Sequence, residues 1–278
     1  MSFNIQSVTS SLTLDGNGIW VSAEQSAVSY PEHANDLFFE IEENSYWYQH
    51  RNKIILETLK RYPPAGAFFD IGGGNGFVAR GLEQAGYEVV LVEPGPQGAL
   101  HAKQRGLEQV ICSTLEDAGF REDSLPAVGC FDVIEHIEDD VGFANQLRSR
   151  LKQGGRLYAT VPAHRWLWSS EDVGAGHFRR HTIASMKHLV EQAGFELEFA
   201  SYFFSHLVMP IFLLRTVPAA VGLRKPFSAD STKSEHRTPT GMLGRMFTRW
   251  EKKELERLQR GQANTWYGSS CLVVARKR

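Results

Sequence analysis

The stretch FFDIGGGNG, residues 68–76, comes at the end of an apolar run and just before a segment of helical length. Its four glycines allow sharp backbone turns and a close approach of the backbone to a bound molecule. A tight turn without a ligand is the alternative, but it needs neither so many glycines nor acidic residues at two strand ends, here Asp70 and Glu93. We therefore interpret residues 70–76 as a ligand-binding loop.

Outward from this loop, short apolar runs alternate with segments of helical length, which is the pattern of a parallel sheet with crossover helices. The expected helices cover residues 77–85, 139–151 and 183–193, and glycines follow each of them. The expected strands cover residues 67–71, 88–92, 109–112, 127–131, 156–161, 195–202 and 271–276. This alternation predicts an α/β fold.

Two kinds of nucleoside cofactor fit the glycine spacing. Residues 74–79, GNGFVA, match the G-x-G-x-x-A pattern of dinucleotide-binding loops, and Glu93 ends the next strand. Asp70 favours the other kind, because a carboxylate before the loop repels a pyrophosphate but attracts the ammonium and sulfonium charges of S-adenosylmethionine. Glu93 can accept hydrogen bonds from ribose hydroxyls in both cases. The loop is therefore better interpreted as a site for S-adenosylmethionine.

The ordered segments FFDIGGGNG, VVLVEP, FDVIEHIEDD and LKQGGRLYATVPA resemble the class I S-adenosylmethionine-dependent methyltransferases, over about residues 45–202 and the closing strand. The resemblance implies a Rossmann-like, seven-stranded, mostly parallel sheet with helices on both faces and an antiparallel last strand. It also implies S-adenosyl-L-methionine as cofactor, with Thr114 where many relatives have an acidic residue. The residues that it assigns to the cofactor are Asp70, Gly72, Gly74, Asn75, Gly76, Glu93, Pro94, Thr114, Leu115, Cys130 and Phe131.

The segment DVIEH, residues 132–136, holds three potential metal ligands, Asp132, Glu135 and His136. It is similar to an acidic-x-x-Glu-His stretch of ubiquinone-pathway O-methyltransferases, which implies a possible divalent cation. The alternative, which we favour, is that no metal binds, that Asp132 caps the next turn and that Glu135 and His136 are structural.

A second constellation is HFRRH, residues 177–181. Arginines bind phosphate or carboxylate in a bidentate manner, and histidine can act as a base, so this segment is typical of an anion-and-ring site. Alternatively, its two arginines pair with Glu171 and Asp172 and fix a surface loop. Together with an upstream S-x-W-x-x-x-R, the segment resembles bacterial methyltransferases of surface-glycan pathways. The expected catalytic residues are His136, His177 and Arg180, and the expected acceptor-binding residues are Trp47, Arg51, His164, Trp168 and Arg179.

Composition limits the classes of function. The 278 residues are 42% hydrophobic and carry a net charge of −2, which argues against a nucleic-acid-binding protein. The three cysteines are widely spaced, and the N-terminus lacks a basic and apolar leader, so we expect a cytoplasmic protein, possibly peripheral at the inner leaflet.

Four units are expected along the chain: an acidic and aromatic helical cap over residues 1–62, the cofactor-binding core over 63–202, an insertion over 203–264, and the closing strand over 265–278. The insertion joins an apolar run, 203–223, to an excess of basic residues, with a mobile loop expected over 224–240. It is interpreted as a lid over the acceptor, as a peripheral membrane contact through residues 203–225, or as core or homodimer packing. The acidic first 50 residues could also fold over its basic surface.

These observations predict a methyltransferase that acts on an oxygen of a small-molecule, ring-bearing or lipid-linked (glycan or isoprenoid) acceptor. Two alternatives stay open. One is an NAD(P)-dependent oxidoreductase with the same fold, and the other is a protein that binds S-adenosylmethionine without turnover.

Overall fold

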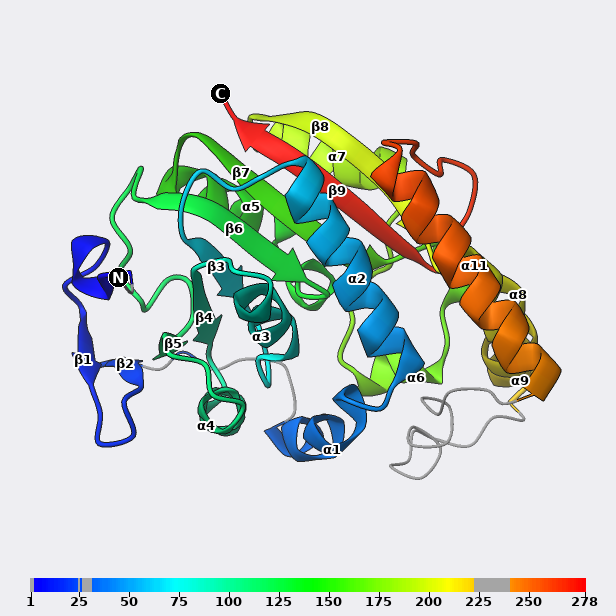
Figure 1. Cartoon of the computed structure of the whole chain (residues 1–278), viewed down its shortest axis with the longest axis horizontal. Helices are drawn as coiled ribbons and strands as arrows, with labels where there is room; N and C mark the ends of the chain where they lie inside the picture. Colours follow the sequence, from blue (N-terminus) through cyan, green and yellow to red (C-terminus); the bar gives the residue numbers. More distant parts are fainter. Residues whose placement is uncertain (1–2, 25, 27–31, 223–240) are drawn as a thin grey trace.

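The computed structural model describes residues 3–24, 26, 32–222 and 241–278. In this part of the chain, one sheet contains nine strands in the order β1-β2-β5-β4-β3-β6-β7-β9-β8 (Figure 1). The strands are β1 (Leu12–Leu14), β2 (Trp20–Ser22), β3 (Phe68–Ile71), β4 (Val89–Glu93), β5 (Val110–Cys112), β6 (Leu125–Phe131), β7 (Leu151–Pro162), β8 (Phe195–Phe203) and β9 (Ser270–Lys277).

The central strands β3 to β7 run parallel, and β9 is antiparallel to both of its neighbours, β7 and β8. Every residue of β3, β4 and β6 is buried, because helices cover both faces of the sheet. One face packs against α2 (Tyr46–Arg61), α3 (Phe77–Gln84), α4 (Pro96–Gln104) and α11 (Gly241–Gln259), and the other against α5 (Asp140–Arg150) and α7 (Ile183–Gln192) (Figure 1). The predicted α/β fold is confirmed.

Two strands were not expected, and they correct both the strand number of seven and the helical N-terminal cap. The strands β1 and β2 form an antiparallel hairpin, and β2 pairs in parallel with β5. The Asp15 carboxylate closes the turn by accepting the backbone amides of Asn17 and Ile19, at 2.9 and 2.8 Å. Each strand has only three residues, which is too short for alternation to be recognised in the sequence.

Helices follow the hairpin. α1 (Glu32–Glu42) precedes α2, whose first turn is capped by the Ser45 hydroxyl accepting the Tyr48 amide. The acidic side chains of Glu42 and Glu43 pair with Arg105, which follows α4, and the hairpin lies at the sheet edge opposite β8. These acidic parts of the N-terminal segment therefore lie away from α11.

The insertion begins with η4 (Ser205–Leu207) and continues through α8 (Val208–Ile211), the π-helical turn η5 (Phe212–Thr216) and α9 (Val217–Ala220). We call residues 208–220 the insertion helix. Beside it, α11 packs against α2 (Figure 1). The predicted loop over 224–240 lies outside the described residues. Among the residues that the structure describes, no helix is both long and apolar enough to cross a membrane.

Candidate active site

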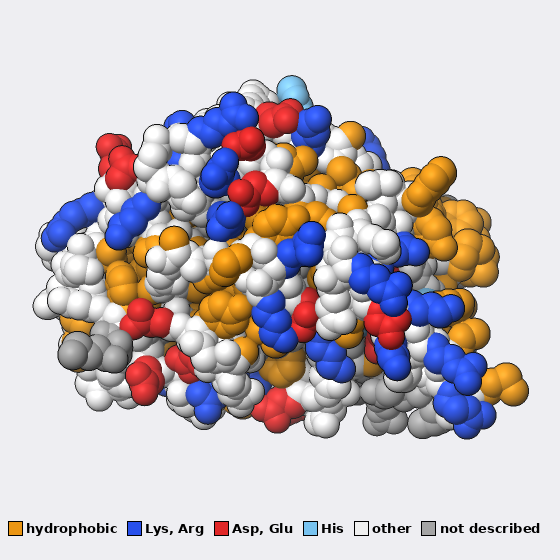
Figure 2. Space-filling view, turned by 45° about the horizontal axis from the view of Figure 1, so that its top comes forward, with side chains coloured by type: hydrophobic (Ala, Val, Ile, Leu, Met, Phe, Trp, Pro, Cys, Tyr) orange, Lys and Arg blue, Asp and Glu red, His pale blue; other side chains and the backbone are white. Residues whose placement is uncertain are grey.

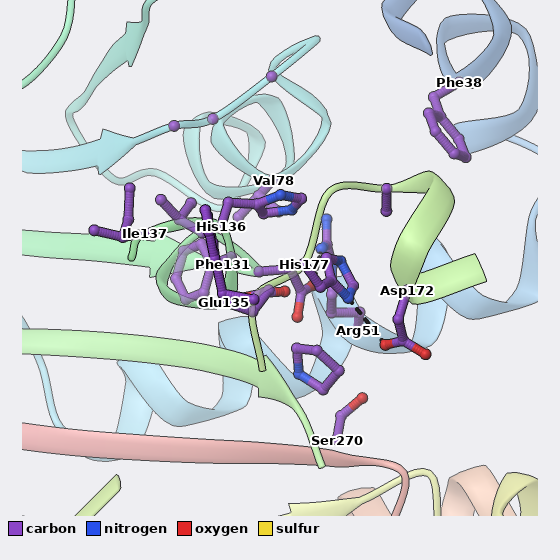
Figure 3. Close-up of a pocket in the computed structure, with 18 of the residues that line it drawn as sticks. Phe38, Arg51, Val78, Phe131, Glu135, His136, Ile137, Asp172, His177 and Ser270 are labelled. Carbon is purple, nitrogen blue, oxygen red and sulfur yellow. Dashed lines mark hydrogen bonds and ion pairs between the residues drawn. The ribbon is translucent and has the colours of Figure 1, made fainter. Parts of the chain in front are cut away.

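A cavity of about 1000 Å³ lies beyond the carboxyl ends of the parallel strands. Its wall combines the glycine loop after β3, the end of β4, the segment after β6, part of α1 and the insertion helix. Figure 3 shows Phe38 of α1 and the residues after β6 in this wall. Because β3 and β6 are neighbours whose crossover helices lie on opposite faces, the strand order reverses here, which is where α/β sheets bind ligands. The topology therefore places the cavity at the expected edge.

Glycines shape the wall of the cavity next to β3. Gly72 has a φ of 69°, and a Cβ added there would lie 2.7 Å from a methyl carbon of Val133. Gly74 has a φ of 55°, and a Cβ there would meet no atom within 4 Å. Since Gly74 lines the cavity, the loop leaves open space directly over its backbone. This is the close backbone approach that the glycine pattern predicted.

Two carboxylates flank this open space. Asp70 is 1% exposed, and its Oδ2 accepts no hydrogen bond in the described part of the structure. Burial raises the pKa of Asp70 to about 7, against the opposing charge of Arg51. Burial also raises the pKa of Glu93 to about 7, although its oxygens accept the backbone amides of Gly74 and Gly95, both at 2.8 Å. A buried acceptor without a partner suits a cationic ligand, so the residues fit S-adenosylmethionine better than a pyrophosphate.

The helix α1 covers this cofactor side of the cavity. Asn75 of the glycine loop donates to the Asn35 carbonyl at 2.9 Å, and its amide oxygen lies 2.9 Å from Nδ1 of His101. Arg105 bonds the Asn75 carbonyl at 2.9 Å and Glu42 at 2.7 Å. The cavity lining includes Asn35, Phe38 and Glu42, which the sequence interpretation missed. An acidic segment far from the loop gives no spacing that would have connected them.

On the acceptor side, Asp172 of the short helix α6 (Ser170–Gly174) has two hydrogen-bond partners, His177 and Arg180. Its Oδ1 lies 3.0 Å from Nδ1 of His177 and 2.7 Å from Nε of Arg180, and its Oδ2 accepts from Nη2 of Arg180 at 3.0 Å (Figure 3). Burial alone would raise the pKa of Asp172, but hydrogen bonds from His177 and Arg180 outweigh it and lower the pKa to about 2. Asp172 is therefore an anion that orients His177.

Glu135 and His136 lie beside His177, and the ligand atoms of the three residues are all within 4.8 Å of one another (Figure 3). Glu135 is 1% exposed, and neither of its oxygens accepts a hydrogen bond from another described residue. Burial, and then the nearby Asp132 charge, raise the pKa of Glu135 well above its usual value. Burial and His177 lower the pKa of His136 to about 4, so that His136 is neutral at pH 7.

The predicted metal ligands, Asp132, Glu135 and His136, differ in one residue from the cluster in the structure. The Asp132 carboxylate pairs with Arg51 and does not cap the following turn, whose N-cap is Val133. His177 takes the third position beside Glu135 and His136. The ligand atoms of these three residues, and not those of the predicted set, are close enough together for one cation.

Most of the predicted site residues line the cavity: Asp70, Gly72, Gly74, Asn75, Glu93, Pro94, Thr114, Leu115 and Phe131 on the cofactor side, and Trp47, Arg51, His136, His177 and Arg180 on the acceptor side. Five do not line it: Gly76, Cys130, His164, Trp168 and Arg179.

The two arginines of HFRRH make hydrogen bonds and ion pairs within the protein. Arg180 gives its donors to Asp172 and to the Ala163 carbonyl. Arg179 bonds the Glu138 carbonyl at 2.6 Å and pairs with Asp140. The alternative interpretation was correct for Arg180 and Asp172, but Arg179 has Asp140 as its partner, not Glu171.

Solved structures share the fold. An S-adenosylmethionine-dependent methyltransferase from Thermotoga maritima, described as a possible histamine N-methyltransferase, aligns with a TM-score of 0.56 at 16% identity, over 88% of this chain and 96% of that one. Phosphoethanolamine N-methyltransferase 2 from Haemonchus contortus, in complex with S-adenosyl-L-methionine, aligns with a TM-score of 0.54 at 18% identity, over 89% and 57% of the two chains. At these identities the likeness shows the fold alone.

Curated relatives are nearer in sequence. Ubiquinone biosynthesis O-methyltransferases from Xanthomonas axonopodis pv. citri (strain 306) and Xylella fastidiosa (strain 9a5c) are each 30% identical over 118 and 119 residues. These matches cover 40% of this chain and 49% and 48% of the relatives, so the chain spans about half the length of the curated relatives it matches. A family model described as "Methyltransferase domain" matches residues 46–198, more than half of the chain. The chain therefore belongs to the methyltransferase-domain family, with S-adenosylmethionine as its cofactor.

Proposed function

We propose that the protein catalyses methyl transfer from S-adenosylmethionine to an oxygen of a ring-bearing or lipid-linked acceptor, with His177 as the general base. The observation that carries this proposal is the Asp172–His177 pair at the wall of the cavity, 3.0 Å apart. A hydroxyl or phenol must lose its proton as it is methylated, whereas the protein otherwise needs mainly to align the reactants.

The cofactor supplies an activated methyl group, and the residues that would hold it are Asp70, Glu93 and the glycine loop. A hydrogen bond from Nδ1–H of His177 to Asp172 leaves Nε2 as the acceptor for a hydroxyl proton. When His177 takes that proton it becomes an imidazolium, and the adjacent Asp172 carboxylate stabilises this charge. Arg180 keeps Asp172 in place through two hydrogen bonds.

The lining of the acceptor side supports an acceptor with an apolar body. The wall on this side includes apolar side chains from the end of β6, the segment after it, α5, η4 and the insertion helix. They are Phe131, Ile137, Phe143, Leu207, Ile211 and Leu214. These apolar side chains suit a ring or an isoprenoid chain. The O-methyltransferase names of the curated relatives agree with transfer to oxygen.

Turnover on a panel of acceptors tests the proposal. The panel contains prenylated phenols and catechols, lipid-linked sugars and amines, and formation of S-adenosylhomocysteine is measured. We expect activity on a hydroxyl acceptor and a decrease of at least about 10²-fold in kcat for His177→Ala, as for a lost general base. The matched control is His188→Ala, an exposed histidine on α7. Unchanged turnover in both His177→Ala and His136→Ala, or activity on amines alone, would refute the assignment.

A further inference from the structure

The insertion helix has two different faces. Residues on one side, Pro210, Ile211 and Leu214, line the cavity. The other side, together with the residue just after the helix, carries exposed apolar side chains at intervals of four residues, Met209, Leu213, Val217 and Val221, each between 39 and 62% exposed. Burial of these side chains inside the monomer is therefore incomplete, although the same helix forms part of the wall of the site.

A second exposed apolar row lies on α11. Met242, Met246 and Trp250 are also spaced by four residues and are at least 39% exposed. Phe247 of α11 packs on His206 of η4, with ring centroids 4.9 Å apart, which fixes the start of the insertion helix beside α11. We call these seven exposed side chains the apolar ridge: Met209, Leu213, Val217, Val221, Met242, Met246 and Trp250.

Cations border the ridge. Arg245, Arg249, Lys252 and Lys253 of α11 are all exposed. Of the neighbouring acids, Glu254 is occupied by His50 and by the Ser205 amide and hydroxyl, and Glu256 lies 3.9 Å from Lys252. In Figure 2, hydrophobic side chains project at the right-hand end of the molecule, where α8, α9 and α11 lie, with Lys and Arg side chains next to them. The exposed surface at this end is therefore both apolar and positive.

We infer that the apolar ridge docks on an anionic lipid surface. Apolar side chains that can insert at the headgroup boundary, bordered by cations, are the features that hold interfacial helices on anionic bilayers. A second copy of the chain fits less well, because a self-complementary interface would bring the cations of two α11 helices near each other. The inference rests on the proposed function in one respect: docking would let a lipid-linked acceptor enter the cavity past the insertion helix.

Vesicle flotation tests the docking without any turnover. The full chain is mixed with vesicles of phosphatidylcholine alone, or of phosphatidylcholine and phosphatidylglycerol in equal parts, at low and high salt. We expect flotation with the anionic vesicles at low salt and its loss at high salt, because screening weakens the attraction. Lipids brominated in the acyl chains should quench tryptophan fluorescence in the same samples, since Trp250 belongs to the ridge.

Variants locate the contact. Leu213→Ser with Val217→Ser, and separately Arg245→Glu with Arg249→Glu, should each lower the partition constant by about tenfold or more. The controls are Leu14→Ser, an equally exposed leucine on β1, and Lys152→Glu with Lys187→Glu, exposed lysines elsewhere, and they should float like the wild type. Binding of S-adenosylhomocysteine shows that each variant is folded.

Three results would overturn the inference: no flotation of the wild type at low salt, equal flotation of ridge and control variants, or a dimer in solution that the ridge variants dissociate. None of them bears on methyl transfer, so the docking and the proposed function fail separately.

Discussion

The two sides of the cavity are built differently. On the cofactor side, the site consists of backbone at positive φ and of carboxylates at the ends of β3 and β4, all fixed by the buried sheet. On the acceptor side, the groups come from a 3-10 turn, a five-residue helix and the insertion helix, and ion pairs position them. A site formed by backbone on consecutive residues can be predicted from sequence spacing. A site formed by side-chain contacts between distant residues is recognised only in the structure.

Two buried carboxylates on the acceptor side make the same point in electrostatic terms. Asp172 and Glu135 are each 1% exposed, yet their pKa values move in opposite directions. Hydrogen bonds from His177 and Arg180 hold the pKa of Asp172 at about 2, while burial without such donors raises the pKa of Glu135 well above its usual range. Burial therefore favours the protonated form of Glu135, which can donate a hydrogen bond, whereas the Asp172 carboxylate can only accept.

The largest effect is expected on the acceptor side. Asp172→Asn keeps the shape but removes the charge that orients His177, so we expect kcat to decrease by about 10²-fold or more while affinity for S-adenosylhomocysteine stays near wild type. The pH profile of kcat should also change, which a purely structural role of Asp172 would not cause.

The control is Asp140→Asn, the same change in an ion pair with the neighbouring Arg179, outside the cavity lining. If both variants lost the same activity, or if Asp172→Asn weakened only cofactor binding, the orienting role of Asp172 would be wrong.

The next effect is expected on the cofactor side. Asp70→Asn removes a buried carboxylate that faces the cavity and has one oxygen without a hydrogen-bond partner. A hydrogen bond to a charged group contributes about 1.5–3 kcal/mol, so affinity for S-adenosylhomocysteine should decrease by roughly 10- to 100-fold in calorimetry. Asp123→Asn, an exposed aspartate away from the cavity, serves as the control. Equal affinity of both variants would show that Asp70 does not contact the ligand.

Cofactor binding on this side of the cavity should depend on pH. In the folded protein, burial raises the pKa values of Asp70 and Glu93 to about 7, so both lose protons as the pH rises through 7. A cationic ligand prefers the ionised forms, and its affinity should therefore increase several-fold between pH 6 and pH 8. Calorimetry at several pH values measures this slope. In the wild type, an affinity that stays constant or decreases with pH would contradict this prediction. The double variant Asp70→Asn with Glu93→Gln should show little pH dependence of affinity.

The pH dependence of stability has the opposite sign for the same two groups. A carboxyl whose folded pKa is raised binds its proton more tightly in the folded state, so its contribution to stability declines as the pH rises from the unfolded pKa to about 7. S-adenosylhomocysteine should offset this loss, and it should therefore raise Tm more at pH 8 than at pH 6.

The smallest effect is expected for the helix that covers the cofactor. Arg105→Ala removes the bonds to Glu42 and to the Asn75 carbonyl, so α1 should close less firmly over the site. Affinity for S-adenosylhomocysteine should decrease a few-fold, with kcat unchanged at saturating cofactor. Arg80→Ala, a partly exposed arginine on α3 bonded to Glu83, is the matched control. A loss of kcat without a change in affinity would refute this role of α1.

The sheet core could be predicted from the sequence because its strands are buried on both faces and read as short apolar runs. The seven expected strands all appear, with ends displaced by at most two residues except at β7, which begins at Leu151 where the expected strand began at 156. The glycine loop and its acidic strand ends were likewise visible, since turn geometry and ligand contact fall on consecutive residues.

The remaining features depend on contacts between distant segments. Asp172 comes five residues before His177, but only the folded turn brings its carboxylate against both His177 and Arg180. The pair of Arg51 and Asp132 joins α2 to the segment after β6 and removes Asp132 from the predicted metal set. Such pairings have no local pattern in the sequence. The segment DVIEH therefore indicated that Asp132 belongs to the site, but not that its partner is Arg51.

The most direct test of the central claim is calorimetric titration of the wild-type protein with S-adenosylhomocysteine and, separately, with NAD and NADH. We predict binding of S-adenosylhomocysteine at one site per chain, weakened by Asp70→Asn, and no binding of either nicotinamide cofactor. Selective binding of NAD or NADH, with no heat from S-adenosylhomocysteine, would contradict the assignment of this cavity to methyl transfer.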